Sequence, residues 1–392
     1  MAMEPLTLIV NPGSASRKYI LFAGDEPRAS LHFEYVGEHI ICTLLKGSEA
    51  KEITVDVHDL KEAIRQVLEV FRSQEILHDG EEIGQLGLRI VAPSSFFLED
   101  RVIDNEVVDR LEAVRPHAPL HIEATLTELK VLREVFPETR IVGLSDSAFH
   151  ITKPDYAWNY GLPLRDSDQF DVKRYGYHGL SVASAVYTLN CIGKLPPKLI
   201  VCHIGSGVSV TAVHGGRSVD TTMGYSPLEG VVMATRSGNV DYGALRVLKE
   251  SLDFDDVQLE AYLNHESGLL GLGGSSDIRE LLYREANGDH YAQLALQTYI
   301  YALQKAVGQM AAVLNGADML VFTATVGERS APIRRRILEK LHFLDFILDE
   351  QENERCVSPT SPVCISRLAH SRPVFVVPAG ESAEMLRRMQ LL

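Results

Sequence analysis

The feature that most constrains the fold is a strand–turn–strand pattern that occurs twice, at residues 8–22 and again at residues 199–213. Each copy has an apolar run, a turn rich in Gly and Ser, and a second β-prone run. In a turn of small residues the backbone N–H groups can approach an anion closely, and serine hydroxyls add further donors. The two copies predict a duplicated fold that holds a phosphate chain between its halves.

The rest of the chain alternates strands and helices. A chain of 392 residues exceeds one ordinary core, so two domains are expected. The expected helices are residues 60–71, 122–136 and 291–314, and the further expected strands are residues 86–91, 140–144, 319–322 and 373–378. This alternation predicts an α/β protein. Residues 151–174 are polar and irregular, which suggests a hinge or a loop beside a cleft.

Composition excludes several classes of protein. The hydrophobic content of 45% is that of a globular protein, and a net charge of −15 argues against a nucleic-acid partner. The five cysteines are scattered without a C-x-x-C pair, which favours a reducing cytoplasm over a disulfide framework or a zinc site. No apolar run reaches the ~18 residues of a membrane span, and the start has no signal-peptide pattern. We expect a cytoplasmic protein with no membrane partner.

Three basic side chains stand out. Lys18 follows the first turn, where its ammonium could reach phosphate oxygens, although no P-loop motif is present and a solvated lysine is the alternative. Arg89 lies in an apolar strand, where a guanidinium needs an anion; the alternatives are an edge-strand arginine or a structural ion pair. Arg236 lies in a loop of small polar residues that can present its side chain, or leave it in solvent.

Two histidines and two carboxylates are further candidates. His178 lies between glycines and before a helix, which suggests a presented imidazole, whereas His121 at a helix start is more simply structural. Asp146 and Glu381 each come just after a strand, where a carboxylate can hold a metal or ligand. The competing roles are a helix N-cap for Asp146 and a first-turn glutamate for Glu381.

Several long motifs, in one order along nearly the whole chain, resemble those of the acetate kinase family, which includes acetate and propionate kinases. The motifs are residues 146–150 (DSAFH), 174–179 (RYGYHG), 219–230 (VDTTMGYSPLEG), 235–238 (TRSG), 267–271 (SGLLG) and 275–279 (SSDIR). The departures described below make the chain a divergent member.

The resemblance implies a two-domain α/β fold of the actin, sugar kinase and heat-shock-protein type, a duplicated ribonuclease H-like fold with an interdomain cleft. It implies an N-terminal domain for acyl substrate and phosphate, residues 1–147 with 382–392. It also implies a C-terminal domain for nucleotide binding and dimerisation, residues 148–381. The family forms homodimers, which we carry over as an expectation.

The implied activity is reversible phosphoryl transfer between ATP and acetate, giving acetyl phosphate and ADP, with Mg²⁺ or in its place Mn²⁺. Such a transfer needs in-line positioning and stabilisation of charge on the phosphoryl oxygens. Acetate is already ionised at neutral pH, so no strong base is required. Guanidinium groups suit both the carboxylate and the phosphoryl oxygens.

The resemblance also assigns residues by motif position. The implied catalytic residues are Arg89, Asp146, His178 and Arg236. The implied substrate-binding residues are Asn11, Arg89, Val91, Leu120, His121, Tyr177 and Pro227. The implied metal-binding residues are Asn11, Asp146 and Glu381. The implied nucleotide-binding residues are Ser14, Ser16, Lys18, His203, Gly205, Ser206, Gly207, Asp277, Ile278, Arg279, Thr325, Val326, Gly327, Glu328 and Arg329.

The chain departs from the family pattern at several of these places. The family strand G-H-R-x-V-H-G is GLRIVAP at residues 87–93, so both histidines are absent, and Asn-Pro after His121 is Ile-Glu. Ser206 replaces an Asn, and Tyr177 replaces a Phe. The family's G-I-G-E-N is TVGER at residues 325–329, which adds side chains where nucleotide should bind. These departures leave open a different short-chain acid such as propionate, a different phosphoryl donor, or a non-catalytic nucleotide-binding homologue.

Overall fold

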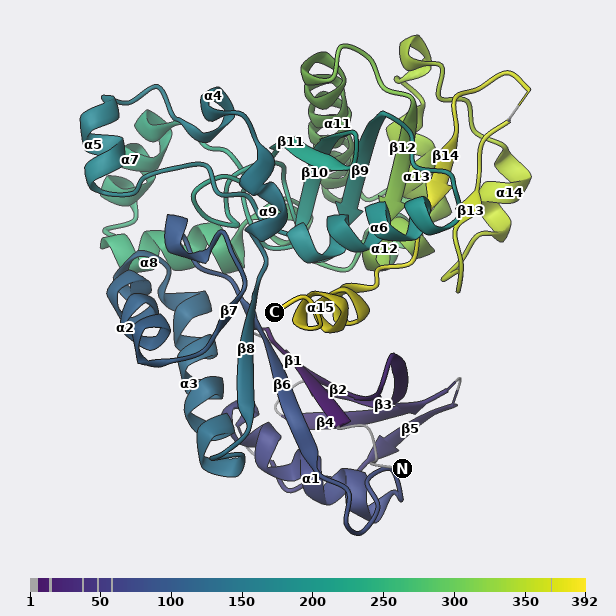
Figure 1. Cartoon of the computed structure of the whole chain (residues 1–392). Coiled ribbons are helices and arrows are strands. Elements are labelled where there is room, and N and C mark those ends of the chain that lie inside the picture. Colours follow the sequence, from purple (N-terminus) through teal and green to yellow (C-terminus); the bar gives the residue numbers. More distant parts are fainter. Residues whose placement is uncertain (1–5, 14–15, 37–38, 48, 58, 368) are drawn as a thin grey trace. The chain divides into compact units, whose positions relative to one another are not determined.

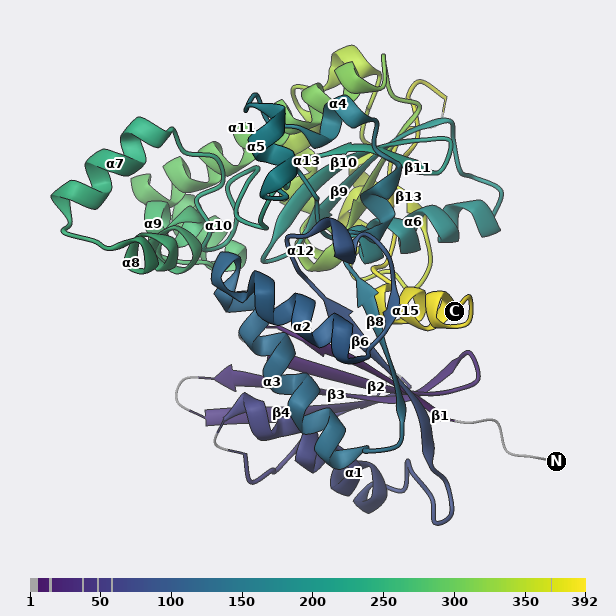
Figure 2. The same ribbon diagram turned by 60° about the vertical axis from the view of Figure 1, so that its left-hand side comes forward.

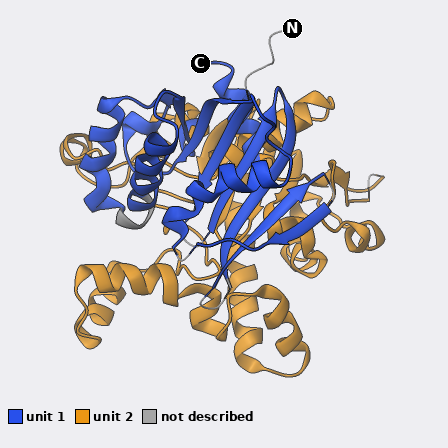
Figure 3. Ribbon diagram, turned by 90° about the horizontal axis from the view of Figure 1, so that it is seen from below, with its two compact units in different colours: residues 1–148, 381–392 blue, residues 149–380 orange. Residues whose placement is uncertain are grey.

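The computed structural model describes residues 6–13, 16–36, 39–47, 49–57, 59–367 and 369–392, without the side chains of Val36, Pro119, Leu120 and His121 (Figure 1). The chain divides into two compact units (Figure 3). Unit 1 comprises residues 1–148 and 381–392, and unit 2 comprises residues 149–380. No described helix is both long enough and apolar enough to cross a membrane.

Unit 1 is built on an eight-stranded sheet with the order β5-β4-β3-β2-β1-β6-β8-β7. Its strands are β1 (Leu6–Pro12), β2 (Ser16–Ala23), β3 (Glu26–Val36), β4 (His39–Lys46), β5 (Glu49–Ile53), β6 (Ile83–Ile90), β7 (Arg101–Val102) and β8 (Arg140–Ser145). Strand β1 forms the predicted hairpin with β2 and lies parallel to β6, which in turn lies parallel to β8. The ends of β1, β6 and β8 therefore meet at one edge.

Unit 2 contains a six-stranded sheet with the order β11-β10-β9-β12-β14-β13. Its strands are β9 (Lys198–Ile204), β10 (Val208–His214), β11 (Arg217–Thr221), β12 (Met319–Thr323), β13 (Val363–Cys364) and β14 (Val374–Val376). Strand β9 forms a hairpin with β10 and lies parallel to β12, and β12 lies parallel to β14. The five strands β11-β10-β9-β12-β14 thus repeat the pairing of β3-β2-β1-β6-β8, and the predicted duplication is confirmed.

The helices of unit 1 cover both faces of its sheet. They are α1 (Ala63–Ser73), α2 (Asn105–Val114), α3 (Pro119–Val135) and α15 (Glu381–Met389). Helices α1, α2 and α3 lie on one face (Figure 2), where alternate strand residues such as Leu8 and Val10 join the same buried cluster. Helix α15 approaches the strands at Gly87, where a Cβ would lie 2.7 Å from Cδ1 of Ile9 and 2.6 Å from Sδ of Met389. A side chain at position 87 would therefore require the Met389 and Ile9 side chains to move.

The helices of unit 2 include the predicted long helix, which is α11 (His290–Val313). The Asp289 side chain caps its start, and the positive φ angles of Asn315 and Gly316 end it. The other helices are α4 (Asp155–Trp158), α5 (Leu164–Gln169), α6 (Gly179–Cys191), α7 (Tyr242–Ser251), α8 (Asp256–Ala261), α9 (Gly268–Gly273), α10 (Ile278–Ala286), α12 (Ala324–Arg329), α13 (Ala331–Leu338) and α14 (Glu350–Arg355). The segment expected to be irregular, residues 151–174, contains two of them, α4 and α5.

Candidate functional site

In unit 1 the guanidinium of Arg89 lies among three oxygen-bearing side chains. Its Nη2 is 2.9 Å from Oδ2 of Asp146, and its Nη1 is 3.2 Å from Oδ1 of Asn11. Nη1 is also 3.8 Å from Oε2 of Glu381. Asn11 is near the end of β1, Arg89 near the end of β6, Asp146 just beyond β8, and Glu381 begins α15. The carboxyl ends of parallel strands are where ligands bind in α/β sheets.

Burial makes this cluster electrostatically strong. Arg89 is 18% exposed and the Asp146 side chain 1% exposed, and the buried Nε of Arg89 has no hydrogen-bond acceptor. Burial lowers the pKa of Arg89, but the charges of Asp146 and Glu381 outweigh it and raise that pKa above its usual value. The arginine is therefore a permanent cation, and separating it from Asp146 would leave a buried charge unpaired.

The oxygen ligands around Arg89 fit a hard divalent cation. Two carboxylates, from Asp146 and Glu381, and the amide oxygen of Asn11 are ligands that Mg²⁺ accepts. Among the residues that the structure describes, no group of three or more His, Cys, Asp or Glu side chains could hold a metal ion. Mg²⁺ is usually held in proteins by one or two carboxylates plus phosphate and water, so Asp146, Glu381 and Asn11 are candidate ligands.

The first Gly-Ser turn lies beside this cluster. Gly13 N–H donates to the carbonyl of Ser16 at 2.9 Å, which closes the β1–β2 hairpin. Lys18 is exposed and pairs with Asn11 in the strand register. Ser14 lies outside the described residues. The hairpin therefore carries Lys18 into solvent on the strand paired with the one that supplies Asn11.

In unit 2 two imidazoles are stacked. The ring centroids of His178 and His203 are 3.8 Å apart, with 21° between the ring planes. Nδ1 of His178 lies 2.9 Å from Oγ of Ser209, and Nδ1 of His203 lies 2.9 Å from Oγ of Ser181. His178 is the N-cap of α6 in a left-handed conformation (φ 60°), which costs energy outside glycine and is typical of functional positions.

The second Gly-Ser turn faces these histidines and Arg236. A Cβ on Gly207 would lie 3.1 Å from Nε2 of His178 and 3.4 Å from Nη1 of Arg236. A Cβ on Gly205 would lie 3.6 Å from Nε2 of His203. These polar groups therefore approach the turn closely, and a side chain at position 207 would crowd His178 and Arg236. We refer to the Gly205–Gly207 turn with His178, His203 and Arg236 as the glycine cradle, a candidate site for an anion.

The loop that carries Arg236 is tied to this cradle. Ala234 N–H donates to the carbonyl of Ser206 at 3.2 Å, and Met233 N–H donates to the carbonyl of Arg236 at 3.1 Å. Nη1 of Arg236 donates to the carbonyl of Pro227 at 3.4 Å. The loop therefore presents Arg236 towards Gly207 instead of leaving it in solvent.

Residues 325–329, which the resemblance assigns to nucleotide binding, form most of helix α12. The fully buried Arg334 donates to the carbonyl of Gly327 at 2.9 Å and so fixes this helix from behind. Nε of Arg329 donates to Oγ of Ser358 at 3.0 Å, and Thr325 is exposed in the first turn. Glu328 accepts a hydrogen bond from Ala379 N–H at 2.8 Å, and Val326 is half-buried.

The remaining predicted residues are dispersed. The Asp277 carboxylate caps α10 and pairs with Arg279 at 2.6 Å, while Ile278 is buried. Tyr177 is 1% exposed and its hydroxyl donates to the carbonyl of Tyr225 at 2.7 Å, close in sequence to buried Pro227. Val91 directly follows β6 in unit 1, and the side chains of Leu120 and His121 lie outside those described.

Sequence reasoning missed the residues that orient the histidines. Ser209 and Ser181 carry no local signal beyond their places in β10 and α6. His150 lies within the quoted motif at residues 146–150 but received no role. It is fully buried, with Nε2 3.0 Å from the carbonyl of Tyr177 and Nδ1 2.8 Å from Oγ of Ser218. Its contact with Tyr177 supports the residue that precedes His178.

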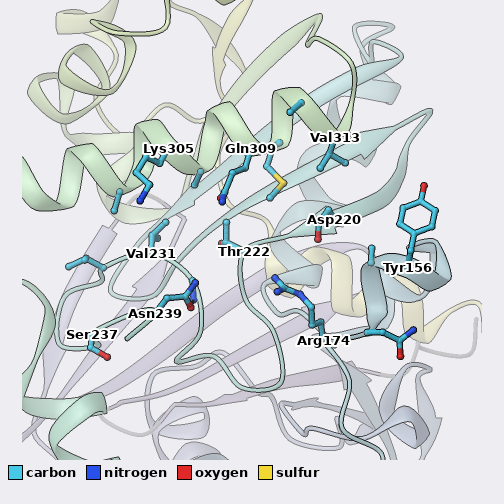
Figure 4. Close-up of a pocket in the computed structure, with 18 residues that line it drawn as sticks. Tyr156, Arg174, Asp220, Thr222, Val231, Ser237, Asn239, Lys305, Gln309 and Val313 are labelled. Carbon is cyan, nitrogen blue, oxygen red and sulfur yellow. Dashed lines mark hydrogen bonds between the residues drawn. The ribbon is translucent and has the colours of Figure 1, made fainter. Parts of the chain in front are cut away.

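A separate cavity of about 660 Å³ lies in unit 2 between α11 and residues 230–239 (Figure 4). Lys305, Gln309 and Val313 line it from α11, opposite Arg174 and Asn239 (Figure 4). None of the predicted site residues lines it. It is therefore distinct from the glycine cradle.

Known proteins resemble this chain over nearly its whole length. The sequence profile of the Acetokinase family matches residues 6–387. An acetate kinase of Sulfurovum sp. (strain NBC37-1) is 34% identical over 394 residues, covering 98% of each chain, and one of Thermoanaerobacter pseudethanolicus is 38% identical over 362 residues, covering 88% of this chain and 89% of that one.

Solved structures agree. The acetate kinase of Porphyromonas gingivalis has a TM-score of 0.86 at 31% identity, with 99% of each chain covered. A propionate kinase from Francisella tularensis has a TM-score of 0.89 at 29% identity, covering 99% of this chain and 100% of that one. The expected α/β fold of the actin and sugar kinase type is confirmed by these likenesses together with the duplicated sheets. On its motifs, fold and relatives, the chain belongs to the acetokinase family.

Proposed function

We propose that the protein is an acetate kinase that transfers a phosphoryl group reversibly between ATP and acetate. The observation that carries the proposal is the approach of His178 and Arg236 to Gly207, because it places an imidazole and a guanidinium beside a glycine turn. The Arg89 cluster, with its oxygen ligands, supports the same chemistry. Membership of the acetokinase family, together with relatives that are acetate kinases, makes acetate the first candidate acceptor.

The proposed transfer needs no proton. A carboxylate oxygen of acetate bonds to the γ-phosphorus of ATP, the bond from that phosphorus to the β–γ bridging oxygen breaks, and ADP leaves with the electron pair. Arg89 holds the carboxylate, while Arg236 and Nε2–H of His178 stabilise the charge on the transferring oxygens. Ser209 accepts from or donates to Nδ1 and thereby orients the His178 ring.

The nucleotide and metal are proposed to bind where the ligand types fit. Mg²⁺, or Mn²⁺ in its place, would be held by Asp146, Glu381 and Asn11, and when bound it neutralises phosphate charge. Lys18 and Ser16 would lie near phosphates, and the Gly205–Gly207 turn and α12 would hold ADP. In unit 2, Tyr177 and Pro227 would contact the acyl methyl group.

The direct test incubates the protein with Mg-ATP and acetate and traps acyl phosphate with hydroxylamine. Acetyl hydroxamate should form, and Arg236→Ala should reduce kcat about 100-fold or more because it removes charge stabilisation in the transition state. The loss of kcat in the double variant Arg89→Ala, Arg236→Ala should be smaller than the product of the two single losses, because the two residues serve one reaction. A folded protein that binds ATP but gives no acyl phosphate with any short-chain acid would be the non-catalytic homologue.

Acyl and donor preference are separate questions. The likeness to a propionate kinase, and the hydroxyl that Tyr177 contributes, make propionate the second candidate acceptor. Thr325 and Arg329 replace the Gly and Asn of the family motif. The identity of the phosphoryl donor is therefore the second question. A panel of acetate, propionate and butyrate against ATP, GTP and pyrophosphate separates these cases by kcat/KM.

We propose further that the protein is a cytoplasmic homodimer. The family resemblance supports the dimer, and so does the outer face of α11, where Tyr291, Leu294 and Tyr301 are 68%, 43% and 60% exposed at helical spacing. All five cysteines are free, as expected in a reducing compartment. Light scattering should give twice the chain mass, and Leu294→Asp with Tyr301→Glu should give monomers if the α11 face is the interface.

A further inference from the structure

A buried charged group in unit 1 has no role in the reaction described above. The carboxylate of Glu128, on α3, is fully buried. Its Oε2 accepts a hydrogen bond from Nε of Arg17 at 3.2 Å, and its Oε1 accepts one from the hydroxyl of Tyr19 at 2.8 Å. Arg17 is 4% exposed and Tyr19 is fully buried. The cluster joins the middle of α3 to strand β2.

The two residues that Glu128 binds flank Lys18. Because side chains alternate along a strand, Arg17 and Tyr19 point to the buried face of the sheet and Lys18 to the exposed face. In the register of the hairpin, Arg17 pairs with Pro12 and Lys18 pairs with Asn11. Glu128 therefore fixes the end of the β1–β2 hairpin, where the first Gly-Ser turn begins.

Stability alone is a poor explanation of this cluster. A buried ion pair is often no more stabilising than apolar side chains of the same volume. Burial raises the pKa of Glu128 to about 7, against the opposing effects of the Tyr19 hydrogen bond and the Arg17 charge. The carboxylate does, however, impose directions that an apolar contact would not, since each oxygen accepts from a different residue of β2.

We propose that Glu128 is a positioning residue for the acyl and phosphate site: it holds the hairpin end against α3 so that Asn11 stays oriented towards Arg89. The link is short. Glu128 binds Arg17, Arg17 pairs with Pro12, and the neighbouring Asn11 accepts from Nη1 of Arg89 at 3.2 Å. This inference rests on the proposed function only in assigning the acetate carboxylate to Arg89.

The first variant is Glu128→Gln, which keeps the shape but turns one oxygen into an NH₂ group that cannot accept from Arg17 or Tyr19. Tyr19→Phe removes one hydrogen bond and serves if the first variant fails to fold. The matched control is Glu81→Gln, which breaks the ion pair with Arg28 (Nη1 to Oε2, 2.7 Å) in the same unit. Neither Glu81 nor its partner Arg28 takes part in the proposed site.

We expect Glu128→Gln to raise the KM for acetate about fivefold, with kcat and the KM for ATP changed less than about twofold, and Tyr19→Phe to give a smaller change of the same kind. Glu81→Gln should leave the KM for acetate unchanged.

The groups that face the Glu128 carboxylate in the described hydrogen bonds are Arg17 and Tyr19 of β2. The acetate KM of the unaltered protein should therefore fall as pH rises through about 7, and this step should vanish in Glu128→Gln.

Amide hydrogen exchange provides a readout that does not need activity. Glu128→Gln should speed exchange in the β1–β2 hairpin while leaving the β9–β10 hairpin as it was. Unchanged exchange in β1–β2, or an unchanged acetate KM at every pH in a variant that is merely less stable, would overturn the inference. Absence of acyl phosphate from the unaltered protein would instead overturn the proposed function, and exchange would still decide the role of Glu128.

Discussion

Nη2 of Arg89 lies 2.9 Å from Oδ2 of Asp146, so that a cation and an anion from adjacent parallel strands meet at one edge of the unit 1 sheet. Each partner is proposed to serve a ligand of opposite charge, Arg89 the acyl carboxylate and Asp146 the metal. The contact keeps both charges compensated when no ligand is bound.

Replacing Asp146 should harm catalysis and also lower the stability of unit 1, because the buried charge of Arg89 loses its partner. In Asp146→Asn the side chain keeps its shape but loses the charge that would bind Mg²⁺, so kcat should fall about 100-fold and the Mg²⁺ concentration for half activity should rise. The measurement is initial rate against Mg²⁺ at saturating ATP and acetate. Glu99→Gln, which breaks an exposed ion pair with Arg101, is the control and should leave the Mg²⁺ curve unchanged. Equal curves for both variants would remove Asp146 from the metal site.

A methyl group on Gly207 should fill the cradle. In Gly207→Ala the added Cβ would lie 3.1 Å from Nε2 of His178, in the space assigned to phosphate, so ATP should bind more weakly and kcat should fall. Gly308→Ala is the matched control: its Cβ meets nothing within 4 Å in the middle of α11, and it should stabilise the protein by about 0.5–1 kcal/mol. Isothermal titration with ATP and thermal unfolding check the pair. Normal ATP affinity in Gly207→Ala would contradict the cradle.

His150 should support the strained backbone at His178. In His150→Leu the carbonyl of Tyr177 loses its hydrogen-bond donor, and kcat should fall about tenfold because the residue before His178 is released. His150→Gln can donate to the same carbonyl and should recover part of the loss. Kinetics with both variants at a temperature where each is folded make the comparison. A Gln variant no better than Leu would mean that volume, rather than the hydrogen bond, matters.

Glu81 should contribute a pH-dependent stability. The hydrogen bond from Arg28 and that from His78 N–H lower its pKa from 4.5 to about 2. Because the folded-state pKa lies below that of the unfolded chain, the stabilisation is complete above about 4.5 and is lost as pH falls towards 2. In Glu81→Gln the urea midpoint should depend less steeply on pH between 3 and 5. Identical pH dependence in the two proteins would contradict the assignment.

Local patterns were enough to predict the α/β class and the two hairpins, whereas strands β3 to β5 were missed and the fold type came from the family resemblance. The two Gly-Ser turns lie between paired strands, β1–β2 and β9–β10, and the long helix at residues 291–314 is α11 within one residue at either end. The lengths of apolar runs, the turn residues and the caps carry this information. Residues 325–329 are expected to bind nucleotide, which stays a prediction; the local pattern did not predict that they form a short helix, whose Gly327 carbonyl accepts from Arg334.

The supporting contacts could not be predicted in the same way. Glu128 and Arg17 are far apart in the chain, and so are His150 and Ser218. Neither partner stands out in its own helix or strand, since a buried glutamate in an amphipathic pattern resembles an exposed one. Only the packing of α3 against β2 reveals why Glu128 is there.

The position of α15 has a consequence for how the chain is made. Met385 and Met389 are buried in unit 1, and Met389 covers Gly87 on the central strands. During translation, every residue of unit 2 leaves the ribosome before α15 does, although strands β1 to β8 of unit 1 leave it before unit 2. Unit 2 can fold vectorially, whereas unit 1 must keep an apolar sheet face uncovered until α15 has been synthesised. Nascent chains stalled before residue 381 should therefore recruit chaperones through their N-terminal part.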